Sequence, residues 1–367
     1  MSTISSVAPS TNSKLAERPP HPDLLPLKGE KERRRCASVK KNKSLAEDSL
    51  RVLKFVVACL ALVATLASAR ADDWPSHPVR IVVAFGAGGS ADILGRLVAA
   101  ELSDAFNQRF FVENRPGNSG SIGSAMVARA EPDGYTLLIG GSGPHLTGPA
   151  INPNIGYDPM RDFTHIAMIA GDTYALAANP ALGARTLADV IRLAHERPLA
   201  SASPGPGSLG HLLLIQFNRL AGIDIAHIPT PGGTVTDVLG NHVPLALTTV
   251  LTVGQHLRSG ALAGIALTST ERNAVFRDIP TFAESGYPDM HGSTWFWLTA
   301  PKGLPAPIVE KLNRAMRKAI HSPRVEQYFA QQALMTTDLD VAGVNRFLRE
   351  ELAYWAPLAK ESGLRVQ

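Results

Sequence analysis

From about residue 74 onward, short apolar strands alternate with helical segments along nearly the whole chain. The strand-like runs include VRIVVAF, YTLLIGG, HIAMIAG, LASAS and VPLALTT, and helix-like runs such as SADILGRLVAAELSDAF and TLADVIRLAHERP separate them. Alternation at this spacing is typical of βαβ units, in which helices connect parallel strands. The sequence therefore predicts an α/β fold with mostly parallel sheets.

The C-terminal part departs from this alternation. Two amphipathic helices are predicted there, at 307–321 and 341–362. Pro305 and Pro307 mark the start of the first helix, and Pro323 follows its predicted end.

The first 71 residues have a different character from the rest. Residues 1–50 are rich in Pro, Ser and charge without apolar periodicity, so we expect a disordered extension. Residues 51–71 combine a positively charged start, an apolar core and the small-x-small end Ala69-Arg70-Ala71. This pattern is typical of a secretory signal peptide and is too short for a stable membrane anchor. We predict cleavage after Ala71 and a periplasmic protein.

Removing that segment changes the charge balance of the chain. It holds 13 of the 36 Lys and Arg residues and 6 of the 32 Asp and Glu residues, so the remainder has a net charge of about −3. A slightly acidic chain is not expected to bind nucleic acid. Both cysteines, Cys36 and Cys59, also lie in this segment, which excludes disulfides, thiolate ligands and a cysteine nucleophile from the remainder. We expect neither a metal nor a cofactor.

Three glycine-rich turns follow predicted strands. The first, GAGGS (residues 86–90), precedes a helix and leaves backbone N–H groups at a helix N-terminus, where the dipole favours an anion. The other two are GGSGPH (140–145) and SASPGPGS (201–208). One such turn could simply need positive φ. Three of them at the carboxyl ends of strands favour a shared binding cleft.

An enzyme is the alternative interpretation of the first turn. Gly86 to Ala91 also fits the dinucleotide fingerprint G-x-G-x-x-A, and Glu113 ends the next strand, where an acidic ribose ligand would lie. This reading describes an exported NAD-dependent oxidoreductase, but a lone fingerprint is a weak signal. No P-loop lysine and no H-E-x-x-H motif is present, and Pro144 breaks a G-x-S-x-G elbow at Ser142. We therefore favour a binding protein.

Several longer stretches carry a resemblance to one family. They are WPSHPVRIVVAFGAGGSADILGRL, FVENRPGNSGSIGS, PDGYTLL, YDPMRDF, NHVPLALTT, RDIPTFAESGYP and APKGLPAPIVEKLNRAM. On these stretches, which span nearly all of the chain beyond residue 74, it resembles the solute receptors of tripartite tricarboxylate transporters, also called Bug-type proteins. The resemblance implies a type II periplasmic-binding-protein fold, with two α/β lobes and a ligand cleft between them. It places lobe one at 72–174 and 293–367, and lobe two at 175–292.

The resemblance also implies which residues hold a small carboxylate, mainly through backbone amides and ordered waters. In lobe one they are Phe85, Gly86, Ala87, Gly88, Gly89 and Ser90, with Asp92 nearby; in lobe two they are Ser203, Gly205, Gly207, Ser208 and His211. We add Ser142 and His145 from the third turn, and Thr248 at the end of a strand. Asp92 is expected to cap free amides or to hold bridging waters, because a carboxylate repels an anionic ligand.

Two positions depart from the family pattern. Thr230-Pro231-Gly232 replaces a usual Tyr-Lys/Arg-Gly, and Thr248 stands where an acidic residue is common. Without that carboxylate, the ammonium of an amino acid would lack a partner. A plain dicarboxylate or a less polar carboxylate is expected instead.

The implied function is that of an exported, monomeric solute-binding receptor. It would close around a small di- or tricarboxylate-like ligand and deliver it to the membrane permease subunits of a tripartite tricarboxylate-type transporter. The alternative within the same fold is a ligand-binding sensor subunit that docks on a membrane signalling kinase.

Overall fold

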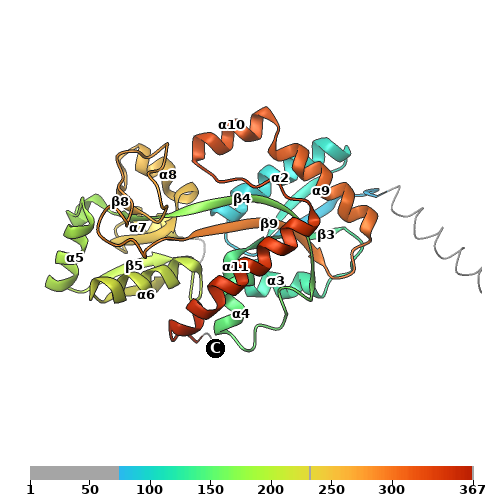
Figure 1. Ribbon diagram of the computed structural model, residues 1–367. Coiled ribbons are helices and arrows are strands. Elements are labelled where there is room, and N and C mark those ends of the chain that lie inside the picture. Colours follow the sequence, from blue (N-terminus) through green and yellow to red (C-terminus); the bar gives the residue numbers. More distant parts are fainter. Residues whose placement is uncertain (1–73, 231–232, 366–367) are drawn as a thin grey trace, which may run out of the picture. The chain divides into compact units, whose positions relative to one another are not determined.

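The computed structural model describes residues 74–230 and 233–365 (Figure 1). The predicted N-terminal extension and signal peptide lie outside the described residues. Within these two ranges, no helix combines the length and the apolar character needed to cross a membrane.

Strands and helices alternate along the described chain, as the sequence predicts. The strands are β1 (Val79–Val83), β2 (Phe110–Asn114), β3 (Thr136–Gly141), β4 (Phe163–Ala178), β5 (Leu199–Ser203), β6 (Ile225–Pro229), β7 (Leu245–Thr249), β8 (Ala263–Leu267) and β9 (Ser293–Pro301). The helices are α2 (Ser90–Phe106), α3 (Ser121–Ala128), α4 (Gly148–Ile151), α5 (Leu187–Glu196), α6 (Leu209–Ala221), α7 (Thr234–Leu239), α8 (Val250–Arg258), α9 (Ala306–Ile320), α10 (Pro323–Gln332) and α11 (Val341–Glu361). Single helical turns lie at Asn118–Gly120, Gly143–Thr147 and Pro180–Leu182.

The strands form two sheets that share β4. Sheet A has the order β2-β1-β3-β9-β4, and sheet B has the order β4-β7-β5-β6, with β8 also paired to β4. In sheet A, β1 is parallel to β2 and β3, whereas β9 is antiparallel to β3 and β4. In sheet B, β5 is parallel to β6 and β7, and β4 is antiparallel to β7 and β8. The two-lobed α/β architecture is confirmed.

Strand β4 is longer than the sequence pattern indicated, because it runs through both sheets. Residues 163–173 pair with β9 in sheet A, and residues 174–178 pair with β7 in sheet B. Figure 1 shows β4 and β9 side by side between the two groups of helices. Strand β4 changes its partner between residues 173 and 174, next to the lobe boundary predicted from the sequence. The lobe boundaries themselves remain a prediction.

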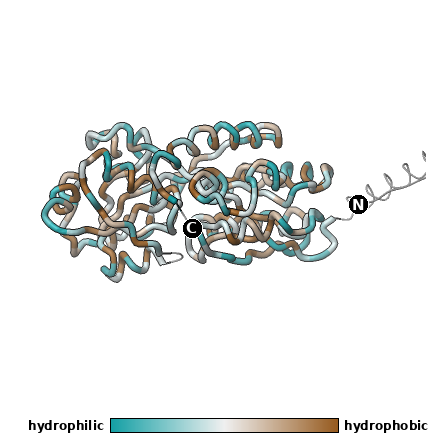
Figure 2. The backbone as a smooth tube through the Cα atoms, turned by 90° about the horizontal axis from the view of Figure 1, so that it is seen from below, coloured by the Kyte–Doolittle hydropathy of each residue, from teal (hydrophilic) through white to brown (hydrophobic). Residues whose placement is uncertain are grey.

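Each sheet is covered by apolar side chains of its own helices. Ile81, Leu137 and Leu298 of sheet A lie in one buried cluster with residues of α2 and α9, and Leu176 and Leu247 of sheet B lie in another with residues of α6. Figure 2 shows hydrophobic stretches along the interior segments and hydrophilic ones at surface turns. Strands covered on both faces read as continuous apolar runs rather than alternating ones, which explains sequences such as IVV and TLLI.

The C-terminal helices are confirmed with small shifts of their ends, but the helix between them, α10, was not predicted. Pro323 does not merely follow α9: it occupies the first turn of α10. Ser322 is the N-cap residue, and its side chain accepts a hydrogen bond from the Val325 amide. Proline is favoured at the first position of a helix, where its missing N–H costs nothing, so the same residue can mark a stop and a start.

Replacing Leu298 by Ala should destabilise the protein by about 2–5 kcal/mol, because this fully buried β9 side chain leaves a cavity in the apolar cluster between sheet A and its helices. The matched control is Leu239→Ala in α7, where the leucine is 37% exposed and the cost should stay within about 0.5 kcal/mol. Urea unfolding measures both. Equal losses for the two variants would contradict the position of β9 in the core.

Candidate functional site

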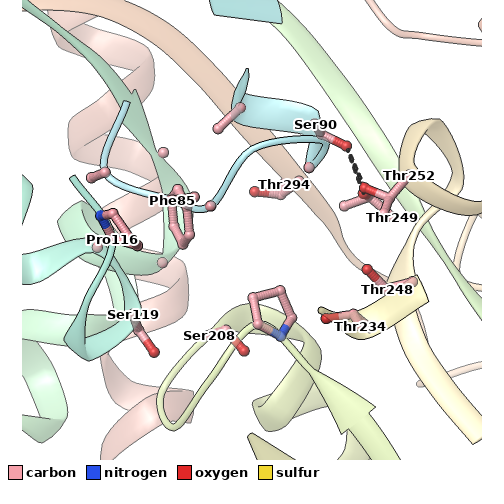
Figure 3. A pocket seen from close by; sticks show the side chains of 18 of the residues that line it. Phe85, Ser90, Pro116, Ser119, Ser208, Thr234, Thr248, Thr249, Thr252 and Thr294 are labelled. Carbon is pink, nitrogen blue, oxygen red and sulfur yellow. Dashed lines mark hydrogen bonds between the residues drawn. The ribbon is translucent and has the colours of Figure 1, made fainter. Parts of the chain in front are cut away.

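A pocket of about 210 Å³ lies where sheets A and B meet. An apolar cavity of ~150 Å³ can hold benzene, so this pocket has room for a small organic molecule. Three segments from the sheet A side line it, at 84–91, 116–120 and 141–143. From the sheet B side, residues of the 204–209, 234–236 and 248–252 segments complete the wall (Figure 3).

The first glycine-rich turn forms one wall, between β1 and α2. Helix α2 begins at Ser90, and no side chain caps it. In the described part of the chain, the amides of Gly89, Ser90 and Ala91 have no hydrogen-bond partner, as is usual in the first turn of a helix. Gly88 has a φ of +82°, which explains the need for glycine at this position. The turn therefore presents donors to the pocket without any cation.

Asp92 supports this turn from behind and does not line the pocket. Its Oδ2 accepts hydrogen bonds from the Gly88 amide and from Arg96 Nε, both at 3.0 Å, and its Oδ1 accepts one from Asn114 Nδ2 at 2.9 Å. Burial alone would raise the pKa of Asp92, but these bonds hold it below its usual value. The carboxylate thus stays ionised and caps the free amide of Gly88.

The second glycine-rich turn, between β5 and α6, forms the opposite wall. Gly205 and Gly207 both have positive φ, at +147° and +79°. Ser208 is the N-cap residue of α6, and its Oγ accepts a hydrogen bond from the His211 amide at 3.3 Å. Of this turn, Pro204 and Ser208 line the pocket.

Two histidines brace the second turn from its far side. His211 and His227 stack with ring centroids 3.6 Å apart, and Ser203 Oγ lies 2.7 Å from His227 Nε2. The Gly207 amide donates to His211 Nδ1 at 3.3 Å. Burial lowers the pKa of both imidazoles to about 4, and the neighbouring His227 adds to the effect on His211. Both rings are therefore neutral at neutral pH and act as packing groups.

The two walls touch each other at one edge of the pocket. Ser119 Oγ donates to the Pro206 carbonyl, and Thr147 Oγ1 donates to the Gly207 carbonyl at 2.9 Å. These contacts join loops on the sheet A side to the second turn on the sheet B side.

A cluster of hydroxyl groups joins the walls at the other edge. Ser90 Oγ lies 2.6 Å from Thr249 Oγ1 and 3.1 Å from Thr252 Oγ1, and the two threonine oxygens are 2.8 Å apart (Figure 3). Behind them, Ser90 Oγ donates to Oδ2 of the buried Asp172 at 2.9 Å. Burial raises the pKa of Asp172 to about 7, against the opposing effect of the hydrogen bonds from Ser90, Leu251 and Thr249.

Of the residues that the sequence predicts to bind the ligand, some line the pocket and others do not. Those that line it are Phe85, Gly86, Ala87, Gly88, Gly89, Ser90, Ser142, Ser208 and Thr248. Those that do not are Asp92, His145, Ser203, Gly205, Gly207 and His211.

His145 lies in a buried aromatic cluster. Its ring packs edge-on against Phe163 and Trp297, with centroids 5.0 and 5.3 Å away. Burial, followed by the nearby His165, lowers the pKa of His145 to about 3. A neutral, enclosed imidazole cannot contact a ligand in the pocket, so His145 belongs to the core.

The sequence reading missed several pocket residues that carry hydroxyl groups. They are Ser119, Tyr174, Thr234, Thr236, Thr249, Thr252 and Thr294. The run LTTVLT at 247–252 offered a signal, because threonines at the end of an apolar strand place hydroxyls at a sheet edge. Asp172 carries no such signal, because an acidic residue inside an apolar strand does not show which distant residues it contacts.

None of the lining residues in the described ranges is Asp, Glu, Lys, Arg or His. An anion in this pocket would be held by amides and hydroxyls rather than by an ion pair. Helix N-termini commonly bind anions in this way. The same ranges contain no group of three or more His, Cys, Asp or Glu that could hold a metal ion.

Comparison with known proteins identifies one family of solute receptors. The family described as "Tripartite tricarboxylate transporter family receptor" matches residues 94–364. Protein BugT of Bordetella pertussis is 33% identical over 322 residues, which are 86% of this chain and 99% of BugT.

Two solved structures of similar proteins hold small acids. Rpa4515 of R. palustris, solved with adipate, is 32% identical, has a TM-score of 0.77, and covers 80% of this chain and 99% of its own. MatC of Rhodopseudomonas palustris, with bound malate, is 28% identical, has a TM-score of 0.74, and covers 78% of this chain and 100% of its own. The family match and the similarity to BugT over nearly its whole length replace the dinucleotide interpretation of Gly86 to Ala91. This chain belongs to the tripartite tricarboxylate transporter receptor family, whose members are periplasmic solute-binding proteins and not enzymes.

Proposed function

We propose that this protein is exported by a cleaved signal peptide, captures a small organic carboxylate in the pocket as a monomer, and delivers it to the permease subunits of a tripartite tricarboxylate-type transporter. The observation that carries the proposal is the uncapped N-terminus of α2, whose free amides belong to residues that line an uncharged pocket. The adipate and malate in two similar structures support the ligand class.

The proposed contacts follow from the geometry of the two walls. One carboxylate group binds at the amides of Gly89 and Ser90, where the α2 dipole favours negative charge. The body of the ligand packs against Phe85 and Phe296, and its far end meets the hydroxyls of the sheet B side. Neutral donors in a partly dry cleft bind an anion with little dependence on salt, unlike exposed lysines or arginines.

A thermal-shift series tests the ligand class. Adipate and malate should raise the melting temperature, since a ligand at ~100 times its Kd adds about 2.7 kcal/mol to the unfolding free energy. The corresponding diamides, which have the same length but no negative charge, should give no shift. If the diamides stabilise the protein as much as the acids do, the ligand is not bound as an anion.

Gly88→Val tests the position of the ligand. Valine is strained at this positive φ and adds a branched side chain to the pocket wall. Carboxylate affinity should therefore fall more than tenfold. Gly183→Val is the matched control: Gly183 has a similar φ of +77° and equally open space, but lies outside the pocket. Its affinity should equal that of the parent, and melting curves should show the same loss of stability in both. Parent-like binding by Gly88→Val would place the ligand elsewhere.

We further propose that the lobes, 72–174 with 293–367 and 175–292, close about β4 and β9 when the ligand binds. Trp295 lies at the start of β9, where its amide donates to Ser142 Oγ at 2.9 Å and its ring packs on Phe347 of α11. Trp297 lies on the same strand. Ligand should therefore change the tryptophan emission of the parent and of Trp74→Phe, but not of the double variant Trp295→Phe/Trp297→Phe. If the ligand changes the emission of the variant without these tryptophans as much as that of the parent, there is no hinge at this point.

A further inference from the structure

A buried carboxylate lies directly behind the pocket. The side chain of Asp172 is almost fully buried, and its hydrogen-bond donors in the described part of the chain are neutral: Ser90 Oγ at 2.9 Å and the Leu251 amide at 3.3 Å from both oxygens, together with the Thr249 hydroxyl and the Thr173 amide. Asp172 lies on β4, Ser90 begins α2 and Leu251 lies in the first turn of α8. The carboxylate therefore connects the two sheets at the floor of the pocket.

The hydroxyl cluster has a limited number of protons. Ser90, Thr249 and Thr252 make three mutual contacts of 2.6 to 3.1 Å, and Ser90 makes a fourth to Asp172. Each hydroxyl can donate once. With Asp172 ionised, the four contacts share three hydroxyl protons, so none is left over for a ligand unless a further contact goes without one. The buried negative charge behind the hydroxyls also repels a carboxylate in the pocket.

We propose that the pocket takes up its carboxylate ligand together with one proton, which is held by Asp172. This inference rests on the function proposed above. A protonated Asp172 donates to Ser90 Oγ and so adds a fourth proton to the cluster; three protons then serve the four contacts as before, while the remaining one, on Thr249 or Thr252, turns to a ligand oxygen. Protonation also removes the buried negative charge next to the anion. Asp172 acts through the hydroxyls and does not touch the ligand, so it is a positioning residue.

The acidity of this group makes proton uptake possible near neutral pH. An aspartate in water is almost fully ionised at pH 7, whereas burial raises the pKa of Asp172 to about 7. Proton uptake by Asp172 is therefore accessible near neutral pH. A bound anion raises the pKa further, because a like charge nearby disfavours ionisation.

Two tyrosines near Asp172 keep their protons in this pH range. Burial and, after it, the charge of Asp172 raise the pKa of Tyr174 on β4 and of Tyr328 on α10 above its usual value of 10. The charged side chains on the neighbouring helices have partners of their own. These contacts are Asp92–Arg96 on α2, Arg258 with Gln332 and Phe276 on α8, and Arg324–Glu101 and Glu326–His321 on α10. The buried histidines, His145, His165, His211 and His227, have pKa values lowered to about 3 or 4 and stay neutral above pH 6.

The sign of the pH dependence follows from linkage. If the protonated form binds the anion, affinity is constant below the pKa of Asp172 and falls tenfold for each pH unit above it. Between pH 6.5 and 8.5 the Kd should therefore rise about 25-fold.

Isothermal titration calorimetry with adipate and malate as probes tests the proposal. The parent should bind with the expected 25-fold change between pH 6.5 and 8.5. Its binding heat at pH 7.5 should differ between buffers of different ionisation enthalpy in proportion to the proton taken up. Asp172→Asn keeps an N–H donor facing Ser90 at every pH, so it should bind at pH 8.5 as tightly as at pH 6.5, without proton uptake. Asp158→Asn, which alters an aspartate far from the pocket with a lowered pKa, should behave like the parent.

The outcomes separate this inference from the proposed function. Binding by the parent without buffer-dependent heat contradicts the inference alone, and this measurement needs no variant, so a failure of Asp172→Asn to fold leaves the test intact. An undiminished pH dependence in a folded Asp172→Asn also overturns it. If neither probe gives binding heat with the parent at any pH, the proposed function fails and the inference fails with it.

Discussion

Everything at the pocket depends on one strand that serves two sheets. Because β4 pairs with β9 over residues 163–173 and with β7 over 174–178, the start of α2 from sheet A and the start of α8 from sheet B come to the same place. Neither lobe could build this pocket alone: the amides come from one side and most threonine hydroxyls from the other. In open α/β sheets the ligand binds beyond the carboxyl ends of the strands, and here two such edges face each other.

The pocket is suited to an anion without holding a cation. Burying an arginine or lysine at this depth would cost desolvation energy whenever the ligand is absent, because an unpaired buried charge is strongly unfavourable. Free amides of α2 cost far less, since every helix has unpaired N–H groups in its first turn. Asp92 and Arg96 then stabilise the turn from outside the pocket, where their charges neutralise each other. A neutral pocket can therefore stay open to solvent and still favour a carboxylate.

The sequence predicted the features that local chemistry determines. The alternation of strands and helices and the glycine-rich turns at 86–90 and 201–208 are local patterns, and the structure contains them. What it could not predict depends on contacts between distant segments. Asp172, Ser90 and Thr249 are far apart in the chain, and no periodicity relates them. The prediction that His145 contacts the ligand is wrong for the same reason. Its glycine-rich surroundings suggested a binding turn, but Phe163 and Trp297 enclose it.

The two edges of the pocket differ in what they can do when the lobes move. At one edge, hydroxyls of Ser119 and Thr147 donate to the carbonyls of Pro206 and Gly207, so the second turn is held by bonds that do not titrate. At the other edge, the contact between Ser90 and Thr249 shares its protons with Asp172, which can gain or lose one. Only the second edge can therefore respond to the charge of a ligand. If the lobes close on a ligand as proposed, closure and the protonation of Asp172 are linked there, because the hydroxyls that join the two sides also line the pocket.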